Sequence, residues 1–489
     1  MADPRRGGNR GHRGQGGRGG PRRSGGRPPV TRASVDAPRA AAYDVLKAVR
    51  VDDAYTNLVL PHVLRSAGLE GRDAAFVTEL VSGTLRRQGT YDAILGACVD
   101  RPLAKVEAKV LDALRLGAHQ VLSMRVPAHA SISTTVDLVR ARVGQGPAGF
   151  TNAVLRKVSA HDLDQWIRRV APTDPVGFAS IAHSHPQWIV SALSDALSAC
   201  GHAEASALDA LLAADNDNPQ VTLVARPGLA TVDELVASGG EVTGRSPYAV
   251  RLTGGDPGAV PAVAEGRAGV QDEGSQLVAL ALAAAELAGR DQHWLDACAG
   301  PGGKSALLAA LAAEGGALLL ASELQQHRAE LVRRGTRAAS AGLSGVVVAD
   351  GTRPAWRPGS FDRVLVDAPC SGLGALRRRP ESRWRRRPKD LADLVPVQRS
   401  LLATALDSVR PGGLVAYVTC SPVLAETKDV VEQVLAGRDD VGVVDAAAVL
   451  ADLPGVDVAE CRGPLPGTVQ LWPHLHRTDA MFLALLRRS

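Results

Sequence analysis

The sequence predicts a multidomain protein whose carboxyl-terminal half is a doubly wound α/β domain. Two observations predict this architecture. Between residues 269 and 489, short and near-continuous apolar runs alternate with segments of helical periodicity, as in parallel strands that are covered on both faces. The chain of 489 residues is also too long for one hydrophobic core. We therefore expect an all-α bundle, a small α+β connector and an α/β domain with a Rossmann-like sheet, in that order.

Residues 1–37 differ in composition from everything that follows. They contain nine arginines, two aspartates and no lysine or glutamate, a formal charge of +7, whereas the whole chain carries +5. The remainder is therefore slightly acidic. Arg/Gly/Pro-rich segments have little to bury, which predicts a disordered tail. Such a tail can contact nucleic-acid backbones, or it can simply keep the protein soluble.

Composition also excludes several classes of protein. No apolar run approaches the roughly 20 residues of a membrane span. The amino terminus has Arg and Gly where a signal peptide has an apolar stretch, so we expect a cytoplasmic protein. The six cysteines are scattered without a C-x-x-C pair, which argues against a disulfide framework and against a zinc site. No obligate protein partner is evident.

Residues 38–165 read as a compact bundle of about six or seven helices, because apolar residues recur at helical spacing and glycines punctuate the segments. Two stretches, FVTELVSGTLR at 76–86 and FTNAVLRK at 150–157, resemble the NusB family. That family binds RNA, so the resemblance implies that this domain helps to dock an RNA. A helical scaffold without RNA contact is the alternative.

Residues 173–266 form the connector. An amphipathic helix opens near His185, a second helix follows at 203–214, and strands at 221–224 and 248–252 flank a helix at 232–238. We expect a small α+β module packed on the next domain, and its residues assign it no function.

The α/β domain spans residues 267–489. It begins with a helix at 277–287. Strands are expected at 293–297, 317–322, 346–349, 361–366 and 414–418, and helices at 304–313, 325–341 and 392–409. A last strand at 481–486 is expected to close the edge of the sheet.

The loop after the first of these strands reads DACAGPGGKS, residues 296–305. Its glycines let backbone amides approach a ligand at a helix amino terminus. A phosphate-binding loop needs glycine where Cys298 stands, and a dinucleotide fingerprint needs glycine where Ser305 stands, so both common nucleotide motifs fail. Glu323 and Asp350 end the next two strands, where they could accept hydrogen bonds from ribose hydroxyls and from an adenine amino group. A nucleoside without phosphates fits best, and S-adenosylmethionine is the leading candidate.

Two thiols stand at strand ends. Cys370 lies in DAPCSGLG, residues 367–374, directly after an apolar strand, and Cys420 lies in TCS, residues 419–421, after another. If the two strands are neighbours, their ends lie about 5 Å apart and both thiols can share one pocket. A thiolate is a strong nucleophile, so one cysteine can attack a substrate and a second can assist it. The residues alone do not rank the two thiols, and a pair of buried structural cysteines is the alternative.

The ordered motifs DACAGPGGKS, VADGT, DAPCSGLG, RRRPESRWRRRP and TCS resemble those of the RNA 5-methylcytosine methyltransferases, class I enzymes that use S-adenosylmethionine. The NusB-like start is similar to members that methylate small-subunit ribosomal RNA. The resemblance implies that Cys420 is the nucleophile, that Cys370 serves release and that Asp367 holds the target base. It also implies a cofactor site made of Cys298, Ala299, Gly300, Pro301, Gly302, Gly303, Lys304, Glu323, Arg328, Asp350 and Asp367.

Other functions stay open at this point. An RNA-binding assembly factor could retain the same domains without catalysis, and a cytosine-5 enzyme acting on DNA would use similar chemistry. The thiol after Thr419 and the NusB-like domain favour RNA.

A basic run, residues 377–389, follows the first thiol. We expect it to contact RNA phosphates, with Trp384 either stacking on a base or packing. Near the carboxyl terminus, Asp479-Ala480-Met481-Phe482 departs from the family's usual Asp-Gly-Phe-Phe, so we expect the packing there to differ from that of the family.

Overall fold

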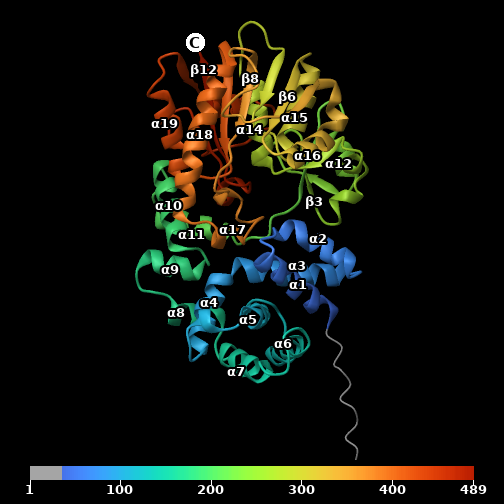
Figure 1. The fold of residues 1–489 in the computed structure, drawn as a ribbon, viewed down its shortest axis with the longest axis vertical. Helices are drawn as coiled ribbons and strands as arrows, with labels where there is room; N and C mark the ends of the chain where they lie inside the picture. Colours follow the sequence, from blue (N-terminus) through green and yellow to red (C-terminus); the bar gives the residue numbers. More distant parts are fainter. Residues whose placement is uncertain (1–35) are drawn as a thin grey trace, which may run out of the picture.

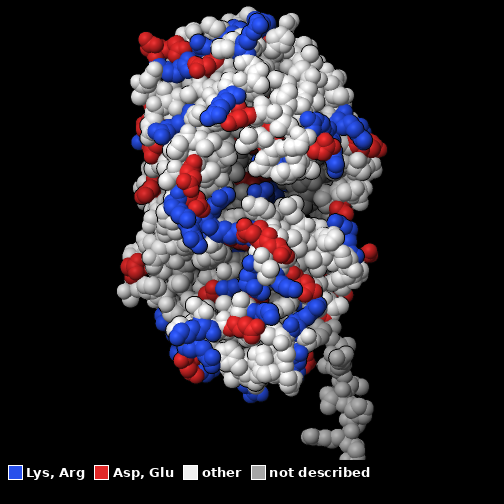
Figure 2. Space-filling model, in the orientation of Figure 1, with Lys and Arg blue, Asp and Glu red and all other residues white. Residues whose placement is uncertain are grey.

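The computed structural model describes residues 36–489. The predicted Arg/Gly tail therefore lies outside the described residues, apart from its last two positions. Figure 1 shows helices in the lower half of the molecule and a large sheet with flanking helices in the upper half. Figure 2 shows a hollow across the middle of the same face, with Lys and Arg side chains in and beside it. In the described residues, no helix is long and apolar enough to cross a membrane.

The amino-terminal domain is all-helical, as predicted. Its core consists of two clusters of buried aliphatic side chains, one around Leu80 and one around Leu114. The helices are α1 (Ala37–Val51), α2 (Thr56–Ser66), α3 (Gly71–Arg86), α4 (Gln88–Cys98), η1 (Leu103–Lys105), α5 (Ala108–Leu122), α6 (Ala128–Arg142) and α7 (Ala148–Val158).

The connector combines helices with a four-stranded antiparallel sheet in the order β2-β3-β1-β4. Strand β4 comes from the stretch that opens the predicted α/β domain, and it pairs with β1. The elements are α8 (Leu163–Val170), α9 (Pro175–Ala182), α10 (Gln187–Ala199), α11 (Ala205–Ala214), β1 (Thr222–Ala225), α12 (Val232–Ala237), β2 (Gly240–Val242), β3 (Ala249–Leu252), η2 (Pro257–Ala259), α13 (Pro261–Ala264) and β4 (Ala268–Val270).

The α/β domain has a large mixed sheet in the order β10-β12-β9-β8-β5-β6-β7, and β11 pairs with β12. The five strands from β9 to β7 are mutually parallel. The elements are α14 (Glu273–Ala284), β5 (His293–Asp296), α15 (Gly303–Glu314), β6 (Leu318–Glu323), α16 (Gln326–Thr336), η3 (Arg337–Gly342), β7 (Leu343–Val348), β8 (Phe361–Asp367), η4 (Leu373–Ala375), α17 (Ser382–Arg385), α18 (Pro388–Ser408), β9 (Val409–Thr419), η5 (Leu424–Glu426), α19 (Lys428–Leu435), β10 (Val441–Val444), α20 (Ala446–Ala451), β11 (Val469–Gln470), α21 (Pro473–His476) and β12 (Phe482–Arg488).

The last strand does not close the sheet, contrary to the prediction. Strand β12 lies between β9 and β10 and is antiparallel to both. The edge belongs to β10, whose sequence VGVV is too short and half-exposed to give a strand signal. Because β12 is interior, its residues Phe482 to Leu486 are fully buried. Residues 479–482, which depart from the family's motif, are therefore still packed in the interior.

Both faces of the sheet are covered. On β8, Leu365 joins a core cluster with side chains of α14 and α15, whereas Val364 and Val366 join a second cluster with side chains of α18. The strand is buried along Phe361–Val366, which explains its continuous apolar run. Strand order reverses at β5, which has β6 on one side and β8 on the other. In open α/β sheets, ligands bind in the crevice outside the carboxyl ends of the strands at this switch point.

Candidate active site

The structure brings the two thiols together. Strands β8 and β9 are parallel neighbours, with Asp367 opposite Val418, so the loops that follow them begin side by side. The Sγ atoms of Cys370 and Cys420 lie 3.4 Å apart. Both cysteines are free and partly buried.

The thiols are chemically unequal. The hydrogen bond that Cys370 donates lowers the pKa of Cys420, and the Lys304 ammonium lowers it too, against the opposing effects of burial and of Asp367. For Cys370, the contact with Cys420, burial and the Glu426 carboxylate all raise the pKa well above its ordinary value. Cys420 is therefore the thiol that ionises more readily, a ranking that the sequence did not provide.

An ion pair joins the first loop of the sheet to the loop that carries Cys370. Lys304, in the first turn of α15, donates to Asp367 Oδ2 at 2.8 Å, and both side chains are largely buried. Burial by itself would lower the pKa of Lys304, but the adjacent Asp367 carboxylate raises it. A permanent positive charge therefore lies beside the thiol pair.

The loop from Cys298 to Gly303 folds against the end of β6. The backbone N–H of Gly300 donates to Glu323 Oε2 at 2.9 Å, and Arg328 donates to the Gly300 carbonyl at 2.5 Å. A Cβ atom on Gly300 would overlap the Glu323 carboxylate, and Gly302 has a φ of +113°, so glycine is required at both positions. The loop is therefore a tight backbone cradle beside a carboxylate.

Acidic groups follow three adjacent strands at this edge. Asp296 ends β5 and accepts from Ser305 Oγ at 2.7 Å, and burial raises its pKa to about 7. Glu323 ends β6 and is nearly fully buried. Asp350 follows β7, and hydrogen bonds from Thr352 lower its pKa, so its carboxylate stays ionised. Carboxylates along a glycine cradle suit the hydroxyl and amino donors of a nucleoside rather than a polyphosphate.

One carboxylate of the site escaped the sequence analysis. Glu426 is completely buried in η5 and accepts from Ser371 N at 2.7 Å, Ser371 Oγ at 2.5 Å, Ser421 Oγ at 2.7 Å and Gln398 Nε2 at 3.1 Å. The serines directly follow the two thiols. A lone glutamate six residues after Cys420 has no periodic or motif signal, and only the fold reveals its partners.

Most of the basic run does not face solvent, contrary to the prediction of phosphate contact. Arg383 is fully buried and donates to Asn216 Oδ1 at 2.9 Å and to the carbonyls of Arg86, Ser184 and Asp215. Arg377 and Arg378 both pair with Asp479. Arg383 thus bonds to the helical domain and the connector, whereas Arg377 and Arg378 pair with a carboxylate of their own domain.

The remainder of the run divides between packing and exposure. Arg385 donates to the carbonyls of Val49 and Ala54, and Arg386 donates to the Ser371 carbonyl. Trp384 packs on Gly89, where a Cβ atom would overlap its ring. Exposed cations of the run are Arg379, Arg387 and Lys389.

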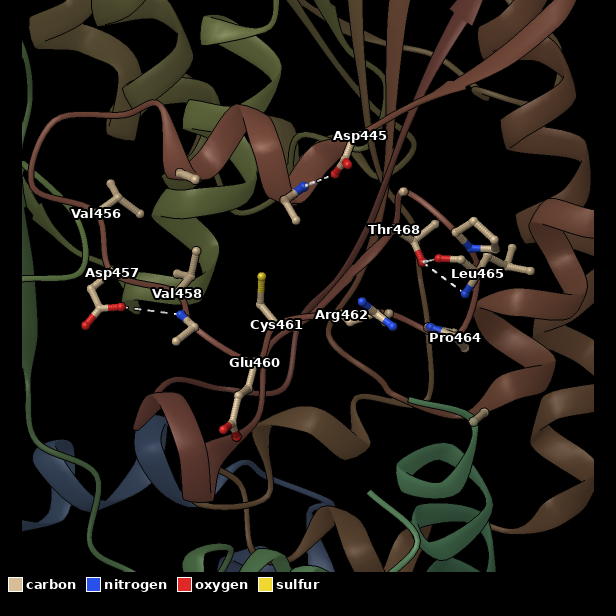
Figure 3. Close-up of a pocket in the computed structure, with 17 residues that line it drawn as sticks. Asp445, Val456, Asp457, Val458, Glu460, Cys461, Arg462, Pro464, Leu465 and Thr468 are labelled. Carbon is tan, nitrogen blue, oxygen red and sulfur yellow. Dashed lines mark hydrogen bonds between the residues drawn. The ribbon is translucent and has the colours of Figure 1, made fainter. Parts of the chain in front are cut away.

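A large cavity lies away from the thiols. About 850 Å³ is enclosed by residues 456–468 together with Ala199, Asp445, Ala447 and Ala451 (Figure 3). It contains neither thiol of the pair and none of the cofactor loop. Cys461 is one of the lining residues labelled in Figure 3, and it is a free and buried cysteine.

Comparison with known proteins agrees with this geometry. The model of the 16S rRNA methyltransferase RsmB/F family matches residues 283–487, and that of the NusB family matches residues 36–160. Ribosomal RNA small subunit methyltransferase B of Pseudomonas syringae pv. tomato is 31% identical, over 85% of this chain and 90% of that protein.

The chain belongs to the RsmB/F family. The Mycobacterium tuberculosis protein Rv1407 is 48% identical, over 94% of this chain and 98% of its own length. Among solved structures, PH0851 has the same fold with a TM-score of 0.74 at 20% identity, covering 93% of this chain and 99% of that one. This RsmB/F member is therefore an rRNA methyltransferase with a NusB helical domain in front of its Rossmann-like domain. S-adenosylmethionine is its cofactor, and the glycine cradle with its adjacent carboxylates fits that molecule.

Proposed function

We propose that the protein transfers a methyl group to carbon 5 of a cytosine in 16S ribosomal RNA, through a covalent bond between Cys420 and carbon 6. The observation that carries the proposal is the thiol pair 3.4 Å apart beside the Lys304–Asp367 ion pair. A methyltransferase acting on an oxygen or an exocyclic nitrogen needs no nucleophilic thiol. Cytosine carbon 5 needs one.

In the proposed reaction, the Cys420 thiolate adds to carbon 6 of the ring, and the electron pair of the 5,6 double bond becomes available at carbon 5. Bound S-adenosylmethionine supplies the methyl group that carbon 5 takes up. The proton on carbon 5 then leaves to a base, the 5,6 double bond re-forms, and the bond between carbon 6 and Cys420 breaks to return the thiolate.

The other side chains act on the ring and on the thiols. Asp367 accepts from the exocyclic amine and stabilises positive charge at N3, and its ion pair with Lys304 fixes its orientation. Cys370 hydrogen-bonds the Cys420 sulfur and assists its release from carbon 6. The target base must leave its stack to reach these groups.

The cofactor assignment follows the sequence prediction. In this proposal residues 298–304 form the backbone cradle, Glu323 accepts from the ribose hydroxyls and Asp350 accepts from the adenine amine. Arg328 supports the cradle by donating to the Gly300 carbonyl. Asp367 completes the set at the boundary between cofactor and base.

We assign the domains as residues 38–165 for RNA docking, 173–266 for the connector and 267–489 for catalysis. The hollow between the helical and catalytic halves, with basic side chains in and beside it, supports a path for RNA to the thiols (Figure 2). The tail of residues 1–37 lies outside the described residues.

The proposal is tested by incubating unmodified 16S RNA with S-adenosylmethionine and mapping 5-methylcytosine. Wild-type protein should place one modification, and Cys420→Ala should lower its rate by at least about a thousandfold, as removal of a nucleophile does. Cys461→Ala is the matched control, since Cys461 is a buried cysteine outside the site. Full activity of Cys420→Ala, or methylation at another ring position, would overturn the assignment.

A further inference from the structure

Glu426 connects the turns that carry the two thiols. Its Oε1 accepts from the backbone N–H of Ser371 and from Gln398, and its Oε2 accepts from the hydroxyls of Ser371 and Ser421. Ser371 follows Cys370 and Ser421 follows Cys420, and the two hydroxyls are 3.0 Å apart. Gln398 also donates to the Pro369 carbonyl, on the other side of Cys370. One carboxylate therefore holds both thiol turns against α18.

The charge of Glu426 is not needed for this bridge. All four donors are neutral groups, and a buried carboxylate costs more free energy of desolvation than a neutral amide of the same shape. Glutamine could replace it with every bond kept: its oxygen would accept from the two N–H groups, and its NH₂ would donate to the two hydroxyl oxygens. A purely structural bridge would not require the negative charge.

The carboxylate contacts the two thiol turns differently: it accepts from the backbone N–H of Ser371, next to Cys370, at 2.7 Å, and it reaches the turn of Cys420 through the Ser421 hydroxyl. The Glu426 carboxylate opposes ionisation of Cys370 and raises its pKa. The hydrogen bond from Cys370, and after it the Lys304 ammonium that pairs with Asp367, favour ionisation of Cys420. A proton that two sulfurs 3.4 Å apart can share is thereby biased to stay on Cys370.

We propose that Glu426 is a positioning residue for methyl transfer: it holds the turns of Cys370 and Cys420 together, and its charge keeps the proton of the pair on Cys370, so that Cys420 is the free thiolate. The proposal deepens the proposed function and rests on it for its catalytic consequence. The unequal reactivity of the thiols, however, can be measured without RNA or cofactor.

The test is limited alkylation of the folded protein with iodoacetamide over a pH series around the ordinary thiol pKa of about 8.5. Peptide mass spectrometry then gives the ratio of label on Cys420 to label on Cys370. In wild-type protein this ratio should be at least about ten near neutral pH, since thiolate is the reactive form. In Glu426→Gln it should fall severalfold and stay above one, because the hydrogen bond from Cys370 and the Lys304 charge still favour ionisation of Cys420.

The control is Glu432→Gln, which removes a half-exposed carboxylate on α19, six residues away in sequence. It should leave the labelling ratio unchanged. Glu426→Asp is the second variant, because it keeps the charge but withdraws it from the Ser371 turn, and its ratio should lie between those of wild type and Glu426→Gln. Thermal unfolding identifies which variants are folded. A wild-type ratio in the folded Glu426 variants, or equal labelling of both thiols in the wild type, would overturn the proposal.

Methylation of 16S RNA by the same proteins separates the two proposals. Glu426→Gln should lower kcat about tenfold and leave the KM for RNA unchanged, because it changes the thiolate fraction and not the docking surface. Selective labelling in a wild-type protein that transfers no methyl group to cytosine would sink the proposed function and leave the role of Glu426 in the thiol pair intact.

Discussion

At the scale of single residues, the thiol pair depends on a difference between two identical side chains. Cys370 and Cys420 follow adjacent strands and share a hydrogen bond, yet the Glu426 carboxylate accepts from the backbone next to Cys370 and opposes its ionisation, whereas Lys304 favours ionisation of Cys420. The sequence predicted that the thiols would meet, because the carboxyl ends of two adjacent parallel strands lie side by side. It could not rank them, because the ranking comes from charges that are far away along the chain.

Removing the second thiol should trap the reaction. In Cys370→Ala, attack by Cys420 remains possible but release is impaired, so a covalent protein–RNA adduct should accumulate on a denaturing gel while turnover falls. The loss of the hydrogen bond from Cys370 should also raise the pKa of Cys420, since that bond is the largest effect lowering it. The rise of activity with pH should therefore move to higher pH. Normal turnover without an adduct would remove Cys370 from the mechanism.

At the scale of elements, the loop after β8 is fixed to the ends of its neighbours through backbone contacts. The Gly374 N–H donates to the Cys420 carbonyl at 2.9 Å, and Ala480 N–H donates to the Gly374 carbonyl at 2.8 Å. A Cβ atom on Gly374 would overlap the Ala480 carbonyl oxygen and crowd the Cys420 carbonyl. The loop cannot move away without moving a thiol.

Gly374→Ala should therefore cost both stability and activity. Overpacking of this kind costs about 1–3 kcal/mol of unfolding free energy, and methylation should fall more steeply than stability because both thiol turns shift. Gly149→Ala is the control, since a Cβ atom there meets nothing within 4 Å and the residue is helical. Thermal unfolding and an rRNA methylation assay measure the two effects. Wild-type activity in Gly374→Ala would show that the loop tolerates displacement.

A second element, the end of α11, carries a buried acid with no hydrogen-bond partner for its carboxylate. Asp215 lies 3.5 Å from the buried His185, and burial raises its pKa to about 7. Because this folded-state pKa lies above the unfolded value of about 3.9, the protonated acid favours folding at low pH. That contribution is lost as the pH rises through about 7.

Asp215→Asn should accordingly flatten the dependence of stability on pH. We expect the unfolding temperature of wild type to fall between about pH 4 and about pH 7, the unfolded and folded pKa values of this acid, and that of the variant to fall less. Asp195→Asn, an exposed acid on α10, should behave like the wild type. Parallel curves for wild type and Asp215→Asn would contradict the assignment of a raised pKa.

The bounds of several strands could be predicted from the sequence, but their order in the sheet could not. Strands β5, β6 and β8 were predicted within one residue of their observed bounds, whereas β9 begins at Val409, five residues before its predicted start. Strand β10 has four residues of intermediate or high exposure, so β12 was assigned to an edge that β10 occupies. Strand order depends on pairing across the sheet, and a run such as Phe482–Leu486 has the same pattern in either place.

At the scale of the whole molecule, the loop after Cys370 joins all three domains. Glu381 accepts from the backbone N–H and the hydroxyl of Thr56 at the start of α2, and Arg383 reaches the bundle through Arg86 and the connector through Asp215 and Asn216. The basic run suggested phosphate contact because sequence gives the charge of a side chain but not its partners. Here most arginines of the run bond to backbone carbonyls or carboxylates, some in the neighbouring domains and some in their own.

Arg383→Ala should loosen the junction. Leaving a buried acceptor unsatisfied costs about 1–3 kcal/mol, and this substitution would take the donor away from the carbonyls of Arg86, Ser184 and Asp215 and from Asn216 Oδ1. We expect calorimetry to show separate transitions for the helical and catalytic halves, and limited proteolysis to cut between them. Lys389→Ala, an exposed cation of the same run, should leave one transition. An unchanged profile in Arg383→Ala would show that other contacts hold the domains.

The position of this junction matters for building chimeras. Residues 370–386 contain Cys370 at one end and Arg383, which bonds to the helical bundle, near the other. The catalytic domain therefore carries the surface on which the bundle packs. Consider a hybrid that joins the bundle of one relative to the catalytic domain of another, with the junction near residue 165. In it, the bundle would pack against a surface from a different protein. An exchange of the bundle should therefore include residues 370–386 from the same relative. Exchange of the bundle alone would disturb the position of Cys370 although that residue is unchanged.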